Sequence, residues 1–205
     1  MFMQSQMFVN RCVILQASEF AYLAKGNCVA TYNFEEHITS IPDYPKPGVV
    51  FKDITTLLKE PEGFKAIVDE ISEHFRDFGI TKVIGSEARG FLIGAPVAYS
   101  LGAGFIPARK PNKLPREVLT ESYELEYGNE QLQIHTDALS EKDVVLLVDD
   151  LVATGGTAIA QVKLIERAGA KLAGMGFLME LEFLNPRDAI SKHTDVDVFS
   201  LVKVK

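Results

Sequence analysis

The sequence predicts an α/β protein with a mostly parallel, twisted sheet that helices flank on both faces. Three observations predict this class. The unbroken aliphatic run at residues 144–148 is typical of a strand buried on both faces of a parallel sheet. Apolar residues between Phe64 and Phe75 recur at the spacing of an amphipathic helix. Residues 82–109 follow the order strand, helix, strand, which predicts a right-handed crossover.

The N-terminal third of the chain holds two segments ahead of the first core strand. Phe34, Ile38 and Ile41 recur at helical spacing and predict a short helix that ends before Pro42. Residues 41–55, IPDYPKPGVVFKDIT, are rich in proline, so we expect an irregular flap there.

The remaining elements alternate between strands and helices, as a parallel sheet requires. We expect strands at 82–85, 104–109, 144–148, 172–179 and 196–202, and helices at 64–75, 91–101 and 157–168, the last with Gly169 as its C-cap. Residues 110–131 lack a packed periodicity and are too long for an ordinary connector, which is typical of a lid or a disordered insertion. We also allow for antiparallel strands beside this loop.

Residues 1–31 are the hardest part of the sequence to interpret. Arg11 precedes a short apolar run that faintly resembles a signal or transit sequence, but Gln16, Ser18 and Glu19 interrupt it. We interpret these residues as a poorly ordered extension, with a targeting segment as the alternative. Residues 32–205 are then expected to form one domain.

Composition excludes several classes of function. The net charge of −7 and the pI of about 5.2 argue against general nucleic-acid binding, which needs a basic field. No apolar run approaches the roughly 20 residues that a membrane span requires. Cys12 and Cys28 lie outside every motif and support neither a disulfide framework nor a zinc site, so we expect a reducing, cytoplasmic compartment.

The segment VVLLVDDLVATGGT, residues 144–157, joins a strand to two acids and a glycine loop. Asp149 and Asp150 fall at the carboxyl end of the strand, on an edge expected to face solvent, where they can accept hydrogen bonds from a cis-diol. In the next residues, glycines let successive N–H groups converge at a helix N-terminus, and hydroxyls add donors for a phosphate. These are Ala153, Thr154, Gly155, Gly156 and Thr157. The alternative is a buried strand and a tight turn without a ligand.

A second candidate anion site follows the first core strand. The motif SEARGF, residues 86–91, also falls at the carboxyl edge of the sheet, and Arg89 is its cation. Two strand-to-helix turns at one edge can hold the two ends of 5-phosphoribosyl-1-pyrophosphate (PRPP). The alternative is a Glu–Arg pair that only caps a helix.

These motifs together resemble the adenine phosphoribosyltransferases. SEARGF resembles their pyrophosphate loop, IPDYPKPGVVFKDIT the hood over the base, ARKPNKLP (108–115) a basic strand end, and SYELEYG (122–128) the flexible catalytic loop. VVLLVDDLVATGGT resembles the PRPP signature of type I phosphoribosyltransferases. The resemblance covers about residues 32–181 and implies that family's fold, with a small N-terminal hood and a flexible loop.

The resemblance implies roles for residues along the PRPP site. Asp149 and Asp150 would hold the ribose hydroxyls, and the loop at 153–157 the 5-phosphate. The pyrophosphate site would comprise Glu87, Ala88, Arg89, Arg109, Lys110 and Lys113. On charge alone, the last three could form a solvated basic patch. Mg²⁺ would be carried by PRPP and pyrophosphate, without direct protein ligands.

The adenine site and the catalytic loop are also assigned by resemblance. Val50, Lys52 and Leu181 would enclose adenine, although Val50 and Leu181 could be core residues, and many relatives have Arg in place of Lys52. Glu126 would act near the base, either as proton acceptor or as a loop latch. Tyr127 would close the lid over the reaction.

The function implied is purine salvage, in which adenine and PRPP become AMP and pyrophosphate. The family implies a homodimeric glycosyltransferase with Mg²⁺ as cofactor and no nucleic-acid or membrane partner. One alternative is a sister enzyme for xanthine, hypoxanthine or orotate, because base choice depends on hydrogen bonds that a sequence does not place. Another is a non-catalytic PRPP-sensing regulator, although no helix-turn-helix pattern precedes Tyr32.

Overall fold

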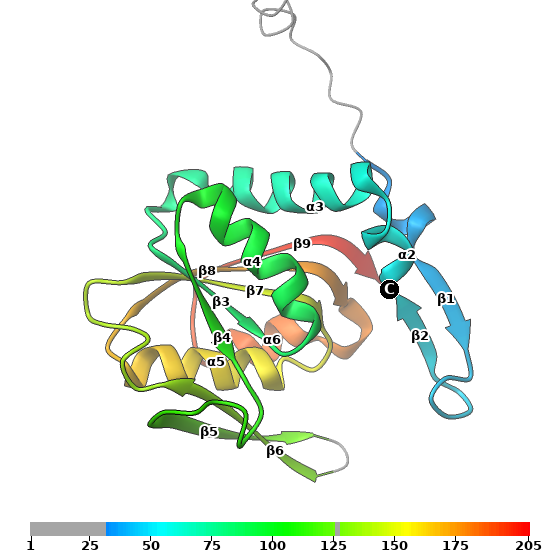
Figure 1. Ribbon diagram of the computed structural model, residues 1–205. Helices are drawn as coiled ribbons and strands as arrows, with labels where there is room; N and C mark the ends of the chain where they lie inside the picture. The colour runs from blue at the N-terminus through cyan, green and yellow to red at the C-terminus, as the bar shows by residue number, and fades with distance from the viewer. Residues whose placement is uncertain (1–31, 126–127) are drawn as a thin grey trace, which may run out of the picture. The chain divides into compact units, whose positions relative to one another are not determined.

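The computed structural model describes residues 32–125 and 128–205, with a parallel sheet at their centre (Figure 1). The sheet has the order β4–β3–β7–β8–β9, and every neighbouring pair is parallel. Its strands are β3 (Lys82–Ser86), β4 (Gly104–Ala108), β7 (Val144–Val152), β8 (Lys171–Leu181) and β9 (Asp197–Val204). The predicted α/β class and all five core strands are confirmed.

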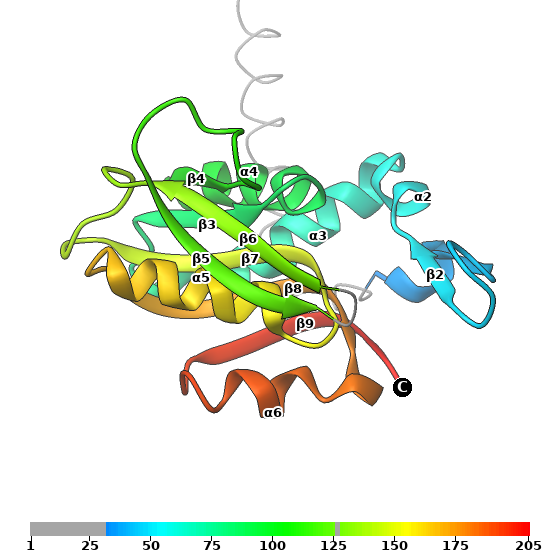
Figure 2. The same cartoon turned by 90° about the horizontal axis from the view of Figure 1, so that it is seen from below.

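Helices cover both faces of the sheet (Figures 1 and 2). The helices α3 (Pro61–His74) and α4 (Arg89–Leu101) pack on one face, where Ile71 and Phe75 lie over the glycines of β8. The helix α5 (Gly156–Arg167) packs on the other face. Shorter helical segments are η1 (Phe34–His37), α2 (Thr55–Leu58), η2 (Arg76–Phe78), η3 (Glu182–Leu184) and α6 (Pro186–Ile190). The C-cap of α5 is Ala168, one residue before the predicted Gly169, which follows it with φ of 79°.

Strand order places a topological switch point between β3 and β7. The chain leaves β3 toward β4 on one side and leaves β7 toward β8 on the other. Such a point opens a crevice at the carboxyl ends of the two strands, where α/β proteins bind ligands. The SEARGF motif begins at the last residue of β3, and the two acids and the glycine loop lie at the end of β7 and directly after it.

The proline-rich flap is more regular than predicted. Helical spacing at Phe34 yields only the single turn η1, and β1 (Thr39–Pro42) then pairs with β2 (Val50–Asp53) as an antiparallel hairpin. The predicted helix up to Ile41 and the irregular flap are therefore wrong in part. The prolines are tolerated because this two-stranded hairpin pairs with no further strand of the described residues. The missing N–H of Pro42 in β1 therefore interrupts no larger sheet.

The predicted irregular loop is largely a second hairpin. β5 (Val118–Leu125) pairs with β6 (Gly128–His135) in antiparallel register, with Tyr123 opposite Glu130. Leu132 and Ile134 are buried on one face of β6, whereas its other face is polar. The prediction was a loop at 110–131 with antiparallel strands beside it. The two strands instead replace most of the loop, and residues 111–117 remain irregular.

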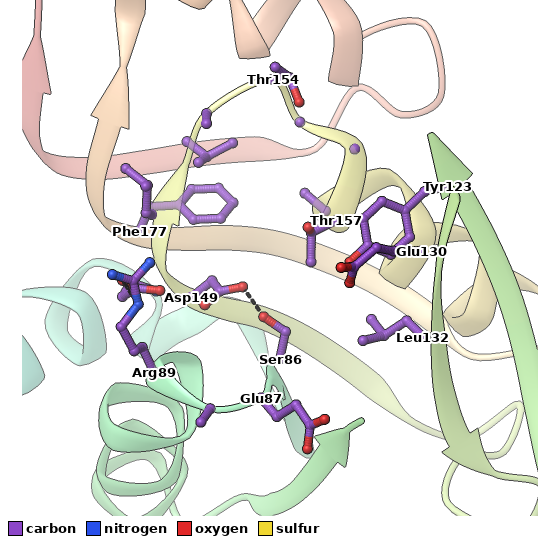
Figure 3. A pocket seen from close by; sticks show the side chains of 18 of the residues that line it. Ser86, Glu87, Arg89, Tyr123, Glu130, Leu132, Asp149, Thr154, Thr157 and Phe177 are labelled. Carbon is purple, nitrogen blue, oxygen red and sulfur yellow. Dashed lines mark hydrogen bonds and ion pairs between the residues drawn. The ribbon is translucent and has the colours of Figure 1, made fainter. Parts of the chain in front are cut away.

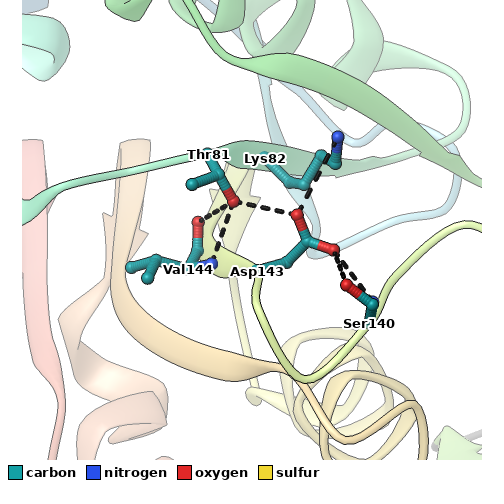
Figure 4. Close-up of polar contacts among 5 residues, drawn as sticks. All are labelled: Thr81, Lys82, Ser140, Asp143 and Val144. Atoms are coloured by element: carbon teal, nitrogen blue, oxygen red, sulfur yellow. Dashed lines mark hydrogen bonds and ion pairs between the residues drawn. The ribbon is translucent and has the colours of Figure 1, made fainter.

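The amino end of the sheet is fixed by a side-chain network (Figure 4). Asp143 accepts hydrogen bonds from the Ser140 backbone N at 2.9 Å and from the Thr81 hydroxyl at 3.0 Å. Thr81 Oγ1 in turn accepts the Val144 N–H at 3.0 Å. Partial burial of Asp143 opposes ionisation, but the hydroxyl and backbone donors lower the pKa of its carboxyl below the ordinary value. The start of β7 is thereby joined to that of β3.

Candidate functional site

A cavity of about 320 Å³ opens at the switch point (Figure 3). The end of β3, the start of α4, the end of β7 and the turn into α5 form its walls, and the hairpin β5–β6 closes one side. Its lining includes residues 86–89 of the SEARGF motif and residues 149–157 of the VVLLVDDLVATGGT segment, which are far apart in sequence. The two motifs are therefore brought together, as their positions after β3 and β7 predict.

Asp149 and Asp150 belong to β7 itself. The strand continues through Val152, so both acids lie within it and are only 6% and 5% exposed. The expectation of a solvent-facing edge is wrong, because α4 packs over this end of the strand and a Cβ on Gly90 would lie 2.5 Å from Asp149 Oδ1. Asp149 Oδ1 accepts the Asp150 N–H at 2.9 Å, and its Oδ2 accepts the Ser86 hydroxyl.

Burial dominates the electrostatics of this acid pair. Burial, with the neighbouring Asp150 charge, raises the pKa of Asp149 to about 8. Burial also raises the pKa of Asp150, against the opposing charge of Arg89. Close carboxylates in a dry site do not both ionise readily, so the pair retains a proton near neutral pH.

Asp150 carries an unsatisfied acceptor. Arg89 Nε lies 3.0 Å from Asp150 Oδ2, but no donor in the described residues is oriented to form a hydrogen bond with that buried oxygen. A buried oxygen without a donor is costly. Arg89 lies against this oxygen and shields it, so a ligand hydroxyl would supply the missing bond only once Arg89 has moved away.

The loop 153–157 lines the same cavity. Gly155 adopts φ of 88°, a left-handed conformation that favours glycine, and α5 begins at Gly156. The helix α6 supports the loop from behind, because a Cβ on Gly155 would lie 3.4 Å from Pro186 O and from Ile190 Cγ1. The N–H groups at this helix start are suited to a phosphate.

The predicted pyrophosphate residues divide into three groups. Glu87, Ala88, Arg89 and Lys110 line the cavity. Arg109 is held beside it, with Nε 2.7 Å from Glu87 Oε2. Lys113 is exposed and lies outside the cavity lining. Its backbone O accepts a hydrogen bond from Arg109 Nη1 at 3.2 Å, and its charge acts on Glu87.

Four further residues line this cavity. Ser86 and Tyr123 belong to predicted motifs but were given no role of their own, and Glu130 and Phe177 were missed. The Lys110 ammonium lies 2.7 Å from Glu130 Oε2, and the Tyr123 hydroxyl donates to the same oxygen at 3.4 Å. The hydrogen bond to Glu130 raises the pKa of Lys110, and burial raises that of Tyr123. The signal for Glu130 was alternation, since it shares the inward face of β6 with Leu132 and Ile134.

A second cavity, of about 150 Å³, contains all three predicted adenine residues. Val50 and Lys52 come from the hood and Leu181 from the end of β8. Val50 is 56% exposed, so it is not a core residue. The two cavities share Arg89, Asp150 and Leu151 and are therefore adjacent.

Two predicted residues, Glu126 and Tyr127, lie outside the described residues, as do the cysteines and the rest of residues 1–31. In the part of the chain that is described, no helix is long and apolar enough to cross a membrane.

Comparisons with known proteins decide the family. The family model "Phosphoribosyl transferase domain" matches residues 53–204. An adenine phosphoribosyltransferase of Aeromonas salmonicida is 55% identical over 170 residues, which cover 83% of this chain and 93% of the relative. The chain belongs to the adenine phosphoribosyltransferases.

Solved structures of adenine phosphoribosyltransferases share the fold. The enzyme of Thermoanaerobacter pseudethanolicus aligns with a TM-score of 0.79 and 45% identity, covering 83% of this chain and 97% of that one. The Giardia lamblia enzyme, in complex with 9-deazaadenine, aligns with a TM-score of 0.79 and 38% identity, covering 83% and 96%. The predicted family, type I fold and enzyme class are confirmed.

Proposed function

We propose that the two adjacent cavities form the active site, in which adenine and PRPP are converted to AMP and pyrophosphate. The single observation that carries this assignment is their shared wall at Arg89 and Asp150. The apolar cavity under the hood is suited to a base, and the cavity at the switch point is suited to a phosphorylated ribose. The bond from base to sugar then forms at the shared wall.

Each half of PRPP meets a group with complementary chemistry. The buried Oδ2 of Asp150 accepts a ribose hydroxyl. Asp149 accepts the Ser86 hydroxyl and the Asp150 N–H, and so holds Asp150 in position for that bond. The 5-phosphate takes the N–H groups and hydroxyls of residues 153–157. Pyrophosphate lies near Arg89 and Lys110, with Arg109 next to them through Glu87.

The mechanism follows from where charge develops. As pyrophosphate departs from C1, the sugar becomes positive and the leaving group more negative. Arg89 moves from Asp150 to the leaving group, and the freed carboxylate faces the positive sugar, so one exchange stabilises both charges. Positioning and electrostatics therefore supply most of the acceleration.

Glu126 is proposed to take the proton that adenine loses, and Tyr127 to help the loop exclude water. Closure of the lid, residues 111–128, over the bound substrates would prevent hydrolysis of PRPP. Magnesium is proposed to enter with PRPP and to keep several of its waters, as hard cations do. The carboxylates in the cavity lining, those of Glu87, Glu130, Asp149 and Asp150, could accept hydrogen bonds from these waters. When bound, the ion would neutralise charge on pyrophosphate.

A homodimer is proposed on the basis of an uncovered apolar face on α4. Leu92 is 50% exposed and Tyr99 is 90% exposed, and Ala95 lies between them at helical spacing. A second copy of the chain would cover such a stripe. Analytical ultracentrifugation of the parent and of Tyr99→Glu tests the homodimer.

The cytoplasmic location stays a prediction.

Purified protein with PRPP, Mg²⁺ and each purine in turn tests the base assignment. A site built to bind the 6-amino group of adenine should discriminate against 6-oxo purines by on the order of 10⁴-fold, because mismatched polar groups would remain unpaired. Comparable turnover of hypoxanthine or guanine would contradict adenine as the preferred base.

A further inference from the structure

Each of three cations at the pyrophosphate site faces a carboxylate. Arg89 Nε lies 3.0 Å from Asp150 Oδ2, Arg109 Nε 2.7 Å from Glu87 Oε2, and Lys110 Nζ 2.7 Å from Glu130 Oε2. A polyanion that binds Lys110 must therefore compete with Glu130. The strength of this competition depends on the Lys110–Glu130 ion pair and not on how tightly the anion binds Lys110.

Glu130 is held less firmly than the carboxylate beside it. Glu87 accepts a backbone hydrogen bond from Lys110 N at 2.9 Å in addition to its bond from Arg109. Among the described residues, the Glu130 carboxylate bonds only the Lys110 ammonium and the Tyr123 hydroxyl. The Glu130 carboxylate, unlike that of Glu87, accepts no backbone hydrogen bond among the described residues. The Lys110 ammonium can thus leave Glu130 without breaking one.

Register keeps Glu130 near the cavity after such an exchange. It lies directly opposite Tyr123 in the β5–β6 hairpin, and the hairpin joins the end of β4 through Arg109 and Gln133, whose N–H···O bonds are 2.8 and 2.7 Å long. Glu130 and Lys110 therefore sit on connected backbone, and the carboxylate remains within reach of the ammonium.

We propose that Glu130 is a positioning residue that competes with pyrophosphate for the Lys110 ammonium and so promotes release of this product. While pyrophosphate is bound, Lys110 contacts it and Glu130 stays next to Tyr123. As pyrophosphate leaves, the carboxylate recaptures the ammonium, which lowers the barrier to dissociation. This inference rests on the proposed position of pyrophosphate beside Lys110.

The test is a double-mutant cycle on pyrophosphate binding, measured by calorimetry with Mg²⁺ present. Glu130→Gln should tighten binding about threefold to fivefold, a size typical of a half-exposed ion pair, and slow dissociation by a similar factor. Lys110→Gln should weaken binding, and Glu130→Gln should have no further effect in that background. Glu130→Asp should restore parent affinity in part.

The control is Glu117→Gln, which removes the same charge from an exposed position just before β5 and should leave binding within experimental error. A carboxylate that merely holds the hairpin in place would give weaker binding when neutralised, which is the opposite sign. Unchanged or weaker binding in Glu130→Gln, with Lys110→Gln impaired, overturns this inference alone. Parent affinity in Lys110→Gln overturns the position of pyrophosphate as well.

Discussion

Arg89 Nε lies 3.0 Å from Asp150 Oδ2 where the base cavity meets the phosphate cavity. The Arg89 guanidinium also lies 5.7 Å from the centre of the Phe51 ring in the hood. One side chain therefore contacts both the hood and the acid pair of the sheet. A base bound under the hood would therefore affect where the Arg89 guanidinium lies, and this guanidinium is the charge proposed to bind pyrophosphate.

Arg89→Lys is expected to lower kcat by about 10²-fold. Lysine keeps the charge but loses the planar guanidinium that lies against Phe51 and can pass from Asp150 to the leaving group. Steady-state kinetics with adenine and PRPP measure the effect. Arg76→Lys, at an exposed pair with Glu73, is the matched control and should retain parent activity. A kcat within twofold of the parent for Arg89→Lys would contradict the assigned role.

The acid pair should make stability dependent on pH. The pKa of Asp149 is raised from 3.8 to about 8 in the folded state. Its protonation therefore stabilises the fold fully below the unfolded value, and this contribution is lost as the pH rises through about 8. Urea unfolding should show the parent losing on the order of a few kcal/mol between acid and alkaline pH.

Asp149→Asn with Asp150→Asn should flatten that pH dependence while impairing catalysis. The double variant removes both titrating groups and also the charge-assisted bonds to the ribose hydroxyls, so KM for PRPP should rise and kcat should fall. Parallel stability curves for the two proteins would argue against a raised pKa. Parent affinity for PRPP in the folded variant would argue against the diol role.

Gly90→Ala is expected to damage the site without unfolding the helix. The new Cβ would lie 2.5 Å from Asp149 Oδ1, so the carboxylate must move away from its Ser86 and Asp150 partners. We expect KM for PRPP to rise about tenfold, corresponding to roughly 1.4 kcal/mol. Ser100→Ala, on the exposed surface of the same helix, serves as control. Unaltered kinetics in Gly90→Ala would show that the carboxylate position is unimportant.

Arg187 should support the phosphate loop through α6. It binds both oxygens of buried Glu180 at 2.8 Å, and Ser200 donates to the same carboxylate at 2.8 Å. Arg187→Leu leaves that charge unpaired and should cost about 2–3 kcal/mol in unfolding free energy, because Arg187 is partly exposed. Adding Glu180→Leu should recover much of the loss. If the double variant is no more stable than the single one, the buried charge is not the cause.

The sequence predicted the sheet because local rules agreed with the tertiary structure. The aliphatic run before Asp149 favours a buried strand, and a glycine loop that follows such a strand lies at the edge where α/β sheets bind ligands. Burial of Asp149 and Asp150 was missed because it depends on α4 and Gly90, which come from a distant part of the chain. Sequence alone does not measure how closely a helix packs on a strand end.

The hairpins show the other limit of sequence analysis. Residues 41–55 looked irregular because of their prolines, and residues 118–125 because charged side chains obscured the alternation. Both segments pair with a partner strand nearby, and this pairing decides their structure. Glu130 escaped attention for the same reason, since only the register with Tyr123 and the contact with Lys110 give it a chemical context.

The network around Asp143 has a consequence for redesign of this enzyme. It fixes the amino ends of β3 and β7, whereas the substrate cavities open at their carboxyl ends, so the two tasks occupy opposite borders of one sheet. Substitutions near Thr81 and Ser140 are therefore expected to change the thermal stability of the protein while base selection stays the same. A library for thermal tolerance should therefore begin at this border and leave the cavities untouched.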